Sequence, residues 1–301
     1  MPAARQRLAA ALLLAGACAG AHAGLPGLCE QPASVSPAEQ DRALRLAGLI
    51  RQELARSGDE VALIARSGTE LGRFGIRYSH AGIALAHNPA GPWSVRQLYY
   101  ACDEAGPRLF DQGLAGFLLG SAEPGRGYVW LLLLPAAEAR ALQASALDKP
   151  TALRLLAADY SANAYAWSTR FQNCNQWVAE LLAAAWQQPG LPAPTREQAQ
   201  RWLHEQAYAP AAIALDSHAL VFAAHFVPLI HVQDHPLADL QALTMQVSMP
   251  SSIEAFVRER APQVRRLEIC HDGTRVLVRR GWREIAAGCR PEPGDELITL
   301  E

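Results

Sequence analysis

Apolar residues recur every three or four positions in several segments, the spacing that places them on one face of a helix. Ser36-Pro37-Ala38-Glu39 reads as a capping box with proline at the first helical position, so we expect a helix from there to Ser57-Gly58. A second capping box, Thr195-Arg196-Glu197-Gln198, begins another helix. Further helices are predicted near residues 136–147, 151–158 and 250–260.

Other segments are rich in β-branched and aromatic residues, as strands are. Residues 128–134 form a continuous apolar run, which predicts a strand buried on both faces. Asp272-Gly273 lies between two such segments and predicts a tight hairpin. Residues 113–120 read as a short apolar surface segment. The strands are expected at 61–65, 78–86, 93–101, 128–134, 219–232, 265–270, 274–279, 282–285 and 296–300.

Helices and strands together predict an α+β protein, which we divide at the proline-dense stretch 189–194. Residues 24–190 would form a first domain, in which a helix packs on a small antiparallel sheet. Residues 191–301 would form a smaller C-terminal α+β domain.

The first residues have the pattern of an export signal. Arg5 and Arg7 precede a short apolar run, and Ala21-His22-Ala23 fits a cleavage site. We therefore expect residues 1–23 to be a signal peptide and the mature protein to be periplasmic or secreted. Lipidation at Cys18 is the alternative, since this cysteine follows an imperfect lipoprotein site. No later segment reads as a membrane span.

The net charge and the cysteine content limit the classes of function that the sequence suggests. The formal net charge is −2 over 301 residues, so the totals do not suggest nucleic acid as a partner. Five cysteines follow the expected cleavage site, and an odd number in an oxidising compartment leaves one thiol over. Four cysteines can pair in three ways. We favour Cys270–Cys289 and Cys29–Cys102, which leaves Cys174 free.

Cys174 stands where a polar loop meets an apolar helical pattern. Free N–H groups and the positive end of the helix dipole converge at such a position and favour a thiolate, so Cys174 is a candidate nucleophile. The alternative is a small buried core residue. A cysteine nucleophile needs a base, and His80 at the start of an apolar strand is the candidate. The alternative for His80 is a structural role.

Other chemistries have weaker support. His218, His225, His231 and His235 have no zinc-type spacing, so we expect neither a metal nor a cofactor. No Gly-x-Ser-x-Gly motif supports a serine nucleophile.

Two short motifs carry a resemblance to known enzymes. Ser79-His80-Ala81-Gly82-Ile83 resembles the Ser-His-Val-Gly-Ile strand of the NlpC-type, papain-like cysteine hydrolases. Asn173-Cys174-Asn175-Gln176-Trp177-Val178 resembles the Asn-Cys-Glu-His-Phe-Val motif of their lecithin retinol acyltransferase-like branch, whose domain is circularly permuted so that histidine precedes cysteine. The chain also resembles a family of exported bacterial proteins of unassigned function. The segments behind this second resemblance are 98–102, 110–113 and 173–177.

The first resemblance implies a permuted papain-like domain with Cys174 as nucleophile and His80 as base. The orienting residue would be Gln97, where many relatives have histidine or a carboxylate. The oxyanion or substrate would be bound by the Cys174 N–H with Asn173 or Gln172, and by Ser79. The reaction would be thiolate attack on an amide, ester or thioester through an acyl-enzyme.

The resemblance and export favour a cysteine hydrolase acting on amide bonds of cell-wall peptides. One alternative is an acyltransferase or esterase acting on lipids. The other is a periplasmic binding or assembly factor that has kept the fold without the activity.

Overall fold

The fold is described from a computed structural model, which describes residues 35–68, 71–102, 104, 106–120, 125–187 and 193–300. The expected signal peptide, Cys29 and residues 189–192 of the proline-dense stretch lie outside these residues.

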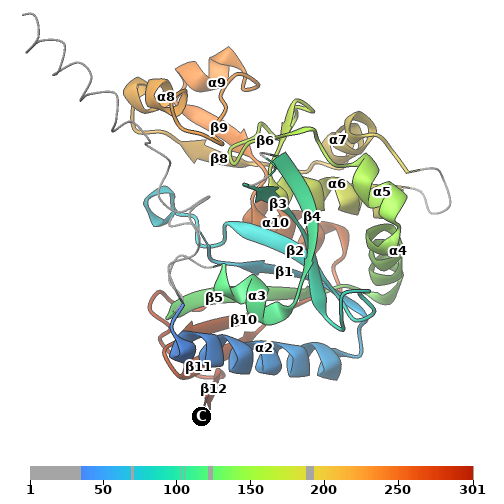
Figure 1. The fold of residues 1–301 in the computed structure, drawn as a ribbon, viewed down its shortest axis with the longest axis vertical. Helices are drawn as coiled ribbons and strands as arrows, with labels where there is room; N and C mark the ends of the chain where they lie inside the picture. Colours follow the sequence, from blue (N-terminus) through green and yellow to red (C-terminus); the bar gives the residue numbers. More distant parts are fainter. Residues whose placement is uncertain are drawn as a thin grey trace, which may run out of the picture. The chain divides into compact units, whose positions relative to one another are not determined.

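An eight-stranded antiparallel sheet is the centre of the fold (Figure 1), with strand order β12-β11-β10-β5-β1-β2-β3-β4. β5 occupies an inner position and is buried along most of its length, as its apolar sequence predicts. The strands of this sheet are β1 (Val61–Arg66), β2 (His80–Leu85), β3 (Ser94–Ala101), β4 (Gly106–Gln112), β5 (Arg126–Leu133), β10 (Arg265–Asp272), β11 (Arg275–Arg280) and β12 (Glu296–Thr299).

Two small sheets accompany it. β6 (Asp159–Tyr160) pairs in parallel with β7 (Phe171–Gln172), just before the Cys174 helix. β8 (Ala211–Ala214) pairs antiparallel with β9 (Thr244–Val247).

Helices lie on both faces of the large sheet. The helices are α2 (Pro37–Ser57), η1 (Gly72–Phe74), α3 (Leu114–Leu119), α4 (Ala136–Leu147), α5 (Lys149–Arg154), α6 (Cys174–Gln187), α7 (Arg196–Glu205), α8 (His218–Ala224), α9 (Leu237–Gln241) and α10 (Pro250–Arg260).

Alternation along the strands divides the core in two. On β1, Leu63 packs into the cluster that includes residues of α4, α6, α7 and α10, whereas Ile64 packs into the cluster of α2 and α3. The two faces of the sheet are therefore covered by different helices. α2 crosses one face, while α6 and α10 lie on the other (Figure 1).

Several helix ends and one hairpin turn lie where the capping and turn residues of the sequence predict them. Ser36 caps α2 in a capping box, and Gly58 ends the helix in the left-handed conformation with φ of 75°. Thr195 caps α7 in the same way as Ser36 caps α2. Asp272 and Gly273 connect β10 to β11, as the hairpin signal predicts.

Three segments differ from the sequence expectation. Within 219–232, predicted as a strand, residues through Ala224 belong to α8, because Ser217 caps a helix there. Segment 113–120 contains α3, and Phe117 is fully buried against the sheet instead of lying at the surface. Residues 282–285 form bends and no strand.

Strands from both sides of the proline-dense stretch contribute to the large sheet. β10 pairs with β5 from Arg265↔Leu133 to Asp272↔Arg126. Cys270 of β10 forms a disulfide with Cys289, which confirms that predicted pair. Cys102 is also disulfide-bonded, and its expected partner Cys29 lies outside the described residues.

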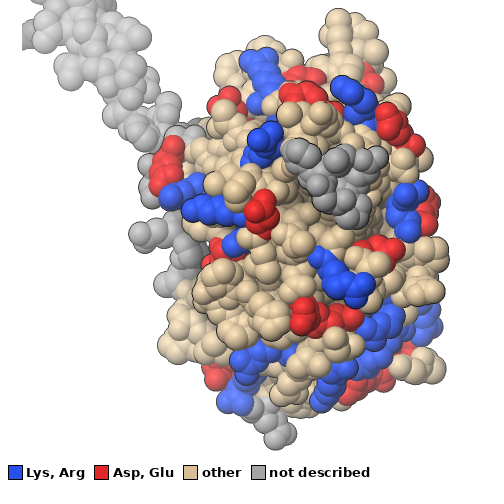
Figure 2. Space-filling view, turned by 90° about the vertical axis from the view of Figure 1, so that its right-hand side faces the viewer, with Lys and Arg blue, Asp and Glu red and all other residues tan. Residues whose placement is uncertain are grey.

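The surface carries charges of both signs. On the face drawn in Figure 2, basic and acidic side chains are interspersed and separated by uncharged residues. No helix among the described residues is long and apolar enough to cross a membrane.

Candidate functional site

Cys174 is the first residue of α6, and Asn173 caps this helix. The Asn173 Oδ1 atom accepts a hydrogen bond from the Gln176 N–H at 2.7 Å. The Asn173 side-chain amide donates to the carbonyls of Ala162 and Ser248. Asn173 is therefore engaged in holding the start of the helix, which leaves the first backbone N–H groups beside the Cys174 sulfur.

Asn175 fastens the first turn of α6 to the start of β2. Its Oδ1 accepts the Ala81 N–H at 3.0 Å, and its Nδ2 donates to the Ser79 carbonyl at 3.1 Å. These two backbone groups flank His80. The buried Asn175 amide thus brings the residue next to Cys174 into direct contact with the residues on both sides of His80.

The His80 ring is held by a chain of two glutamines. His80 Nε2 is 2.5 Å from Gln97 Oε1, and the Gln97 amide donates to Gln112 Oε1 at 2.7 Å. The second bond orients the Gln97 amide with its oxygen toward the ring. Nε2 is then the protonated ring nitrogen, and Nδ1 carries the free electron pair.

Aromatic side chains enclose the same imidazole. The rings of Tyr99 and Phe117 lie 5.6 Å and 5.8 Å from it, and His80 is 7% exposed. Burial and the nearby Arg66 guanidinium lower the pKa of His80 to about 3, although the bond to Gln97 opposes the shift. The imidazole is therefore neutral at physiological pH.

Cys174 does not have the ionisation state expected from its place at a helix N-terminus. Burial raises the pKa of its thiol to about 11, and this effect outweighs Arg66 and the backbone N–H groups of Asn175 and Ala81. The expected thiolate is thus replaced by a neutral thiol. Cys174 is the free cysteine of the described part of the chain and is buried.

His80 and Cys174 approach the start of β2 from different sides. Ala81 and Cys174 belong to the core on the α6 face, whereas the His80 ring contacts Phe117 of α3 on the other face. No hydrogen bond joins the ring to the sulfur among the described residues. Asn175 joins the backbone on both sides of His80 to the first turn of α6, which carries Cys174.

Arg66 was not selected from the sequence but lies in the middle of this site. It is the last residue of β1, directly across from His80 in the strand register. Its electrostatic interactions include both Tyr99 and Cys174. The pKa of Tyr160 is raised chiefly by burial and also by Cys174 and Tyr99, so Tyr160 borders the same region. The available sequence signal was the pair of glycines, Gly68 and Gly120, that lie against this arginine.

The remaining predicted residues have mainly structural contacts. Gln172 bonds to the backbone of Leu155 and Ala157 and to Glu180, so its amide is occupied away from the thiol. Ser79 immediately precedes β2, and its N–H donates to the Arg66 carbonyl.

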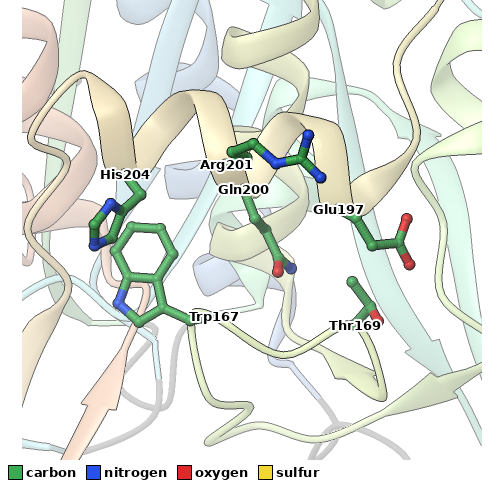
Figure 3. Close-up of a pocket in the computed structure, with 6 residues that line it drawn as sticks. All are labelled: Trp167, Thr169, Glu197, Gln200, Arg201 and His204. Carbon is green, nitrogen blue, oxygen red and sulfur yellow. The ribbon is translucent and has the colours of Figure 1, made fainter.

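The described residues form no metal-ligand cluster at Cys174, and the pocket shown in Figure 3 lies away from it. Across the described residues, no group of three or more His, Cys, Asp or Glu side chains could hold a metal ion. A pocket of about 330 Å³ lies at α7 (Figure 3), where the Trp167 ring meets His204 edge-on. None of its lining residues is Cys174, His80 or Gln97. The lining consists of Trp167, Thr169, Glu197, Gln200, Arg201 and His204.

Comparison with known proteins places the chain in a family. Residues 53–257 match a family of uncharacterized proteins conserved in bacteria (DUF2145), and the chain belongs to this family. The matched range includes β1, β2, β3 and α6, which carry Arg66, His80, Gln97 and Cys174. No curated protein and no solved structure matches the chain.

Proposed function

We propose that the protein is an acyl-transfer enzyme of the cysteine hydrolase type, in which Cys174 is the nucleophile and His80 the general base. The observation that carries this proposal is the Asn175 bridge, which brings the start of α6 to the residues on either side of His80. A thiol at a helix N-terminus, an imidazole and an orienting amide are the parts that this chemistry requires.

The protonation states favour one route for the proton. The thiol and the imidazole are both neutral, so attack and proton transfer would occur together instead of starting from an ion pair. Because Gln97 accepts from Nε2, the basic nitrogen is Nδ1. The Cys174 proton passes to Nδ1 as sulfur bonds to the acyl carbon, and the resulting imidazolium protonates the leaving group. Because the His80 ring and the sulfur lie on different faces of the sheet, this route requires a movement of the imidazole or of the Cys174 turn that brings Nδ1 to the sulfur.

The developing negative charge would be stabilised at the helix N-terminus. The backbone N–H groups of Cys174 and Asn175 already act on the Cys174 sulfur, which places two donors beside the reacting atom. Such donors favour an oxyanion in the transition state. The backbone therefore replaces the side chains of Asn173 and Gln172 that the sequence suggested.

The substrate class is inferred from the expected export and from the surroundings of Cys174. Arg66, Tyr99 and Tyr160 give polar atoms to the region. This setting favours an amide bond in a peptide, such as a cell-wall peptide, over the lipid esters of the alternative acyltransferase reading. The resemblance to permuted papain-like hydrolases supports the same reaction class.

One observation favours a second candidate, a binding or assembly factor without catalysis. Cys174 is 7% exposed, and its pKa is raised to about 11, which keeps the nucleophile protonated. A protein of this kind would retain the Cys174 and His80 positions for packing alone.

A thiol-reactive peptidyl vinyl sulfone distinguishes the two candidates. We expect it to label Cys174 in the intact protein, as mapped by peptide mass spectrometry, and His80→Ala to slow labelling about 100-fold. His87→Ala is the matched control, because His87 is exposed and its ring contacts Glu60, away from Cys174. Labelling that proceeds equally in His80→Ala, or fails at Cys174 altogether, would favour the binding protein.

A further inference from the structure

Arg66 is a buried cation without an acidic partner. It is 5% exposed, and it forms no ion pair with any carboxylate of the described residues. Buried charges in proteins are normally paired, because removing an ion from water costs several kcal/mol. The nearby thiol is neutral and does not compensate the guanidinium. An unpaired cation in this position indicates that an anion binds there.

Two glycines make room for this side chain. A Cβ atom at Gly120 would lie 2.3 Å from Arg66 Nη2, and one at Gly68 would lie 2.7 Å from Nη1. Neither glycine has a φ in the left-handed region, so backbone conformation does not require glycine at either position. The lack of a side chain at Gly120 leaves room for the guanidinium, whereas at Gly68 it leaves room for both the guanidinium and the Ser79 hydroxyl, which would lie 2.6 Å from a Cβ atom.

The guanidinium is hydrogen-bonded to the Tyr99 side chain and to backbone, but within the described part of the chain Nε is left without a partner. Nη1 donates to the Ser67 carbonyl at 3.2 Å, and the Phe117 ring lies 5.2 Å from the guanidinium carbon. Nε is buried and has no hydrogen-bond partner among the described residues. A ligand that displaces the groups covering the edge formed by Nε and Nη2 could accept two parallel hydrogen bonds, one from each nitrogen. This is the geometry that a planar carboxylate accepts.

We propose that Arg66 binds a carboxylate of the substrate beside Cys174, so that the preferred substrate is a peptide with a free carboxylate close to the bond that is cleaved. The catalytic part of this statement rests on the proposed function, whereas carboxylate binding does not. Tyr99, which is 40% exposed and adjacent to the guanidinium, marks the side from which the ligand enters. The carboxylate compensates the buried charge and positions the acyl group at the thiol.

Binding of a carboxylate at Arg66 can be measured by the protection of Cys174 from alkylation, and this measurement does not require the protein to cleave a substrate. N-acetyl-alanyl-alanine, which has a free carboxylate, is compared with the same dipeptide as its C-terminal amide. Iodoacetamide modification of the full chain is followed by intact mass at pH 9. We expect the carboxylate peptide to slow modification of Cys174 and the amide to have little effect.

Substitutions of Arg66 then test the assignment. In Arg66→Met the carboxylate peptide should bind at least about 10-fold more weakly, because a charge-assisted pair is lost, and Arg66→Lys should retain part of the binding. Arg73→Met, at an exposed arginine of η1, is the matched control. In this variant the carboxylate peptide should protect Cys174 from iodoacetamide as well as it does in the wild type. The unfolding temperature of Arg66→Met should be unchanged or higher, since methionine replaces an unpaired buried charge.

Two results would overturn the proposal. One is equal protection by the carboxylate and the amide in the wild type. The other is a carboxylate preference that survives in Arg66→Met. If the wild type shows no carboxylate preference and Arg66→Met also has a lower unfolding temperature, the role of Arg66 is structural. If carboxylate preference is found but Cys174 never becomes acylated, the anion site stands and the proposed enzymatic function fails.

Discussion

Arg66 and His80 face each other across β1 and β2 and are both buried, yet neither has an acidic partner among the described residues. Arg66 remains charged, whereas His80 is neutral because burial disfavours its charged form. A neutral imidazole with a defined tautomer suits a general base. It also makes the stability of the protein depend on pH.

Stability should fall as pH falls below the ordinary histidine pKa. The pKa of His80 is lowered to about 3, chiefly by burial, so between pH 6.5 and 3 the unfolded chain binds one proton more than the folded chain at this residue. The free energy of unfolding then decreases by about 1.4 kcal/mol for each pH unit. His271, with a pKa of about 4, adds a similar slope down to that pH.

Urea unfolding between pH 4.5 and 7.5 measures this dependence. His80→Gln should reduce the slope by the contribution of one histidine, while His87→Gln, at an exposed residue, should leave it unchanged. Parallel curves for the wild type and His80→Gln would contradict the buried neutral state of His80.

Sequence reasoning at the residue scale found the cysteine, the histidine and the glutamine that accepts from its ring. Cys174 and His80 were found because each stands at a recognisable boundary between a loop and an element, whereas Gln97 was named from the resemblance to the permuted papain-like hydrolases. The protonation state of Cys174 was predicted wrongly, since the helix terminus was visible in the sequence while the burial that dominates the pKa was not. Arg66 was missed for the same reason. An arginine at the end of a strand reads as exposed unless the packing around it is known.

Among the elements, α6 depends on one amide for its position on the sheet. Asn175 satisfies one backbone donor and one backbone acceptor of the β2 segment. The helix would otherwise contact β2 through apolar side chains alone, which do not fix its register along the strand. The placement of Cys174 relative to His80 therefore follows from Asn175.

Removal of the Asn175 side-chain amide should destabilise the protein. Asn175→Ala leaves the Ala81 N–H and the Ser79 carbonyl without their partner, which should lower the free energy of unfolding by about 2–4 kcal/mol. Gln187→Ala, at an exposed amide on the last turn of the same helix, should cost less than about 0.5 kcal/mol. Urea denaturation of both variants tests this, and equal midpoints would show that Asn175 does not hold α6.

Where the sequence carries end signals, the prediction was accurate nearly to the residue, as at both ends of α2 and at the start of α7. α8 was mistaken for a strand because its apolar residues are too few to show a period, and the Ser217 cap decides its conformation. β4 was not predicted because its sequence begins with glycine and proline and shows little alternation of apolar and polar residues.

At the scale of the whole molecule, pairing between distant segments builds the sheet. β5 lies between β1 and β10, so strands from 61–66, 126–133 and 265–272 are neighbours. No local pattern encodes such pairings, which explains why the α+β class was predictable and the eight-stranded sheet was not. The sheet sets β1, β2 and β3 side by side, and so gathers Arg66, His80 and Gln97 at one place.

Formation of an acyl-enzyme is the most direct test of the proposed chemistry. The intact protein is mixed with p-nitrophenyl acetate, and released nitrophenol and protein mass are followed together. We expect a rapid release of one nitrophenol per molecule with an acetyl group on Cys174, and a rate at least about 100-fold lower in His80→Ala. Cys174→Ser should show no rapid phase. Equal nitrophenol release by wild type and Cys174→Ser, with no acetyl group on Cys174, would contradict the account.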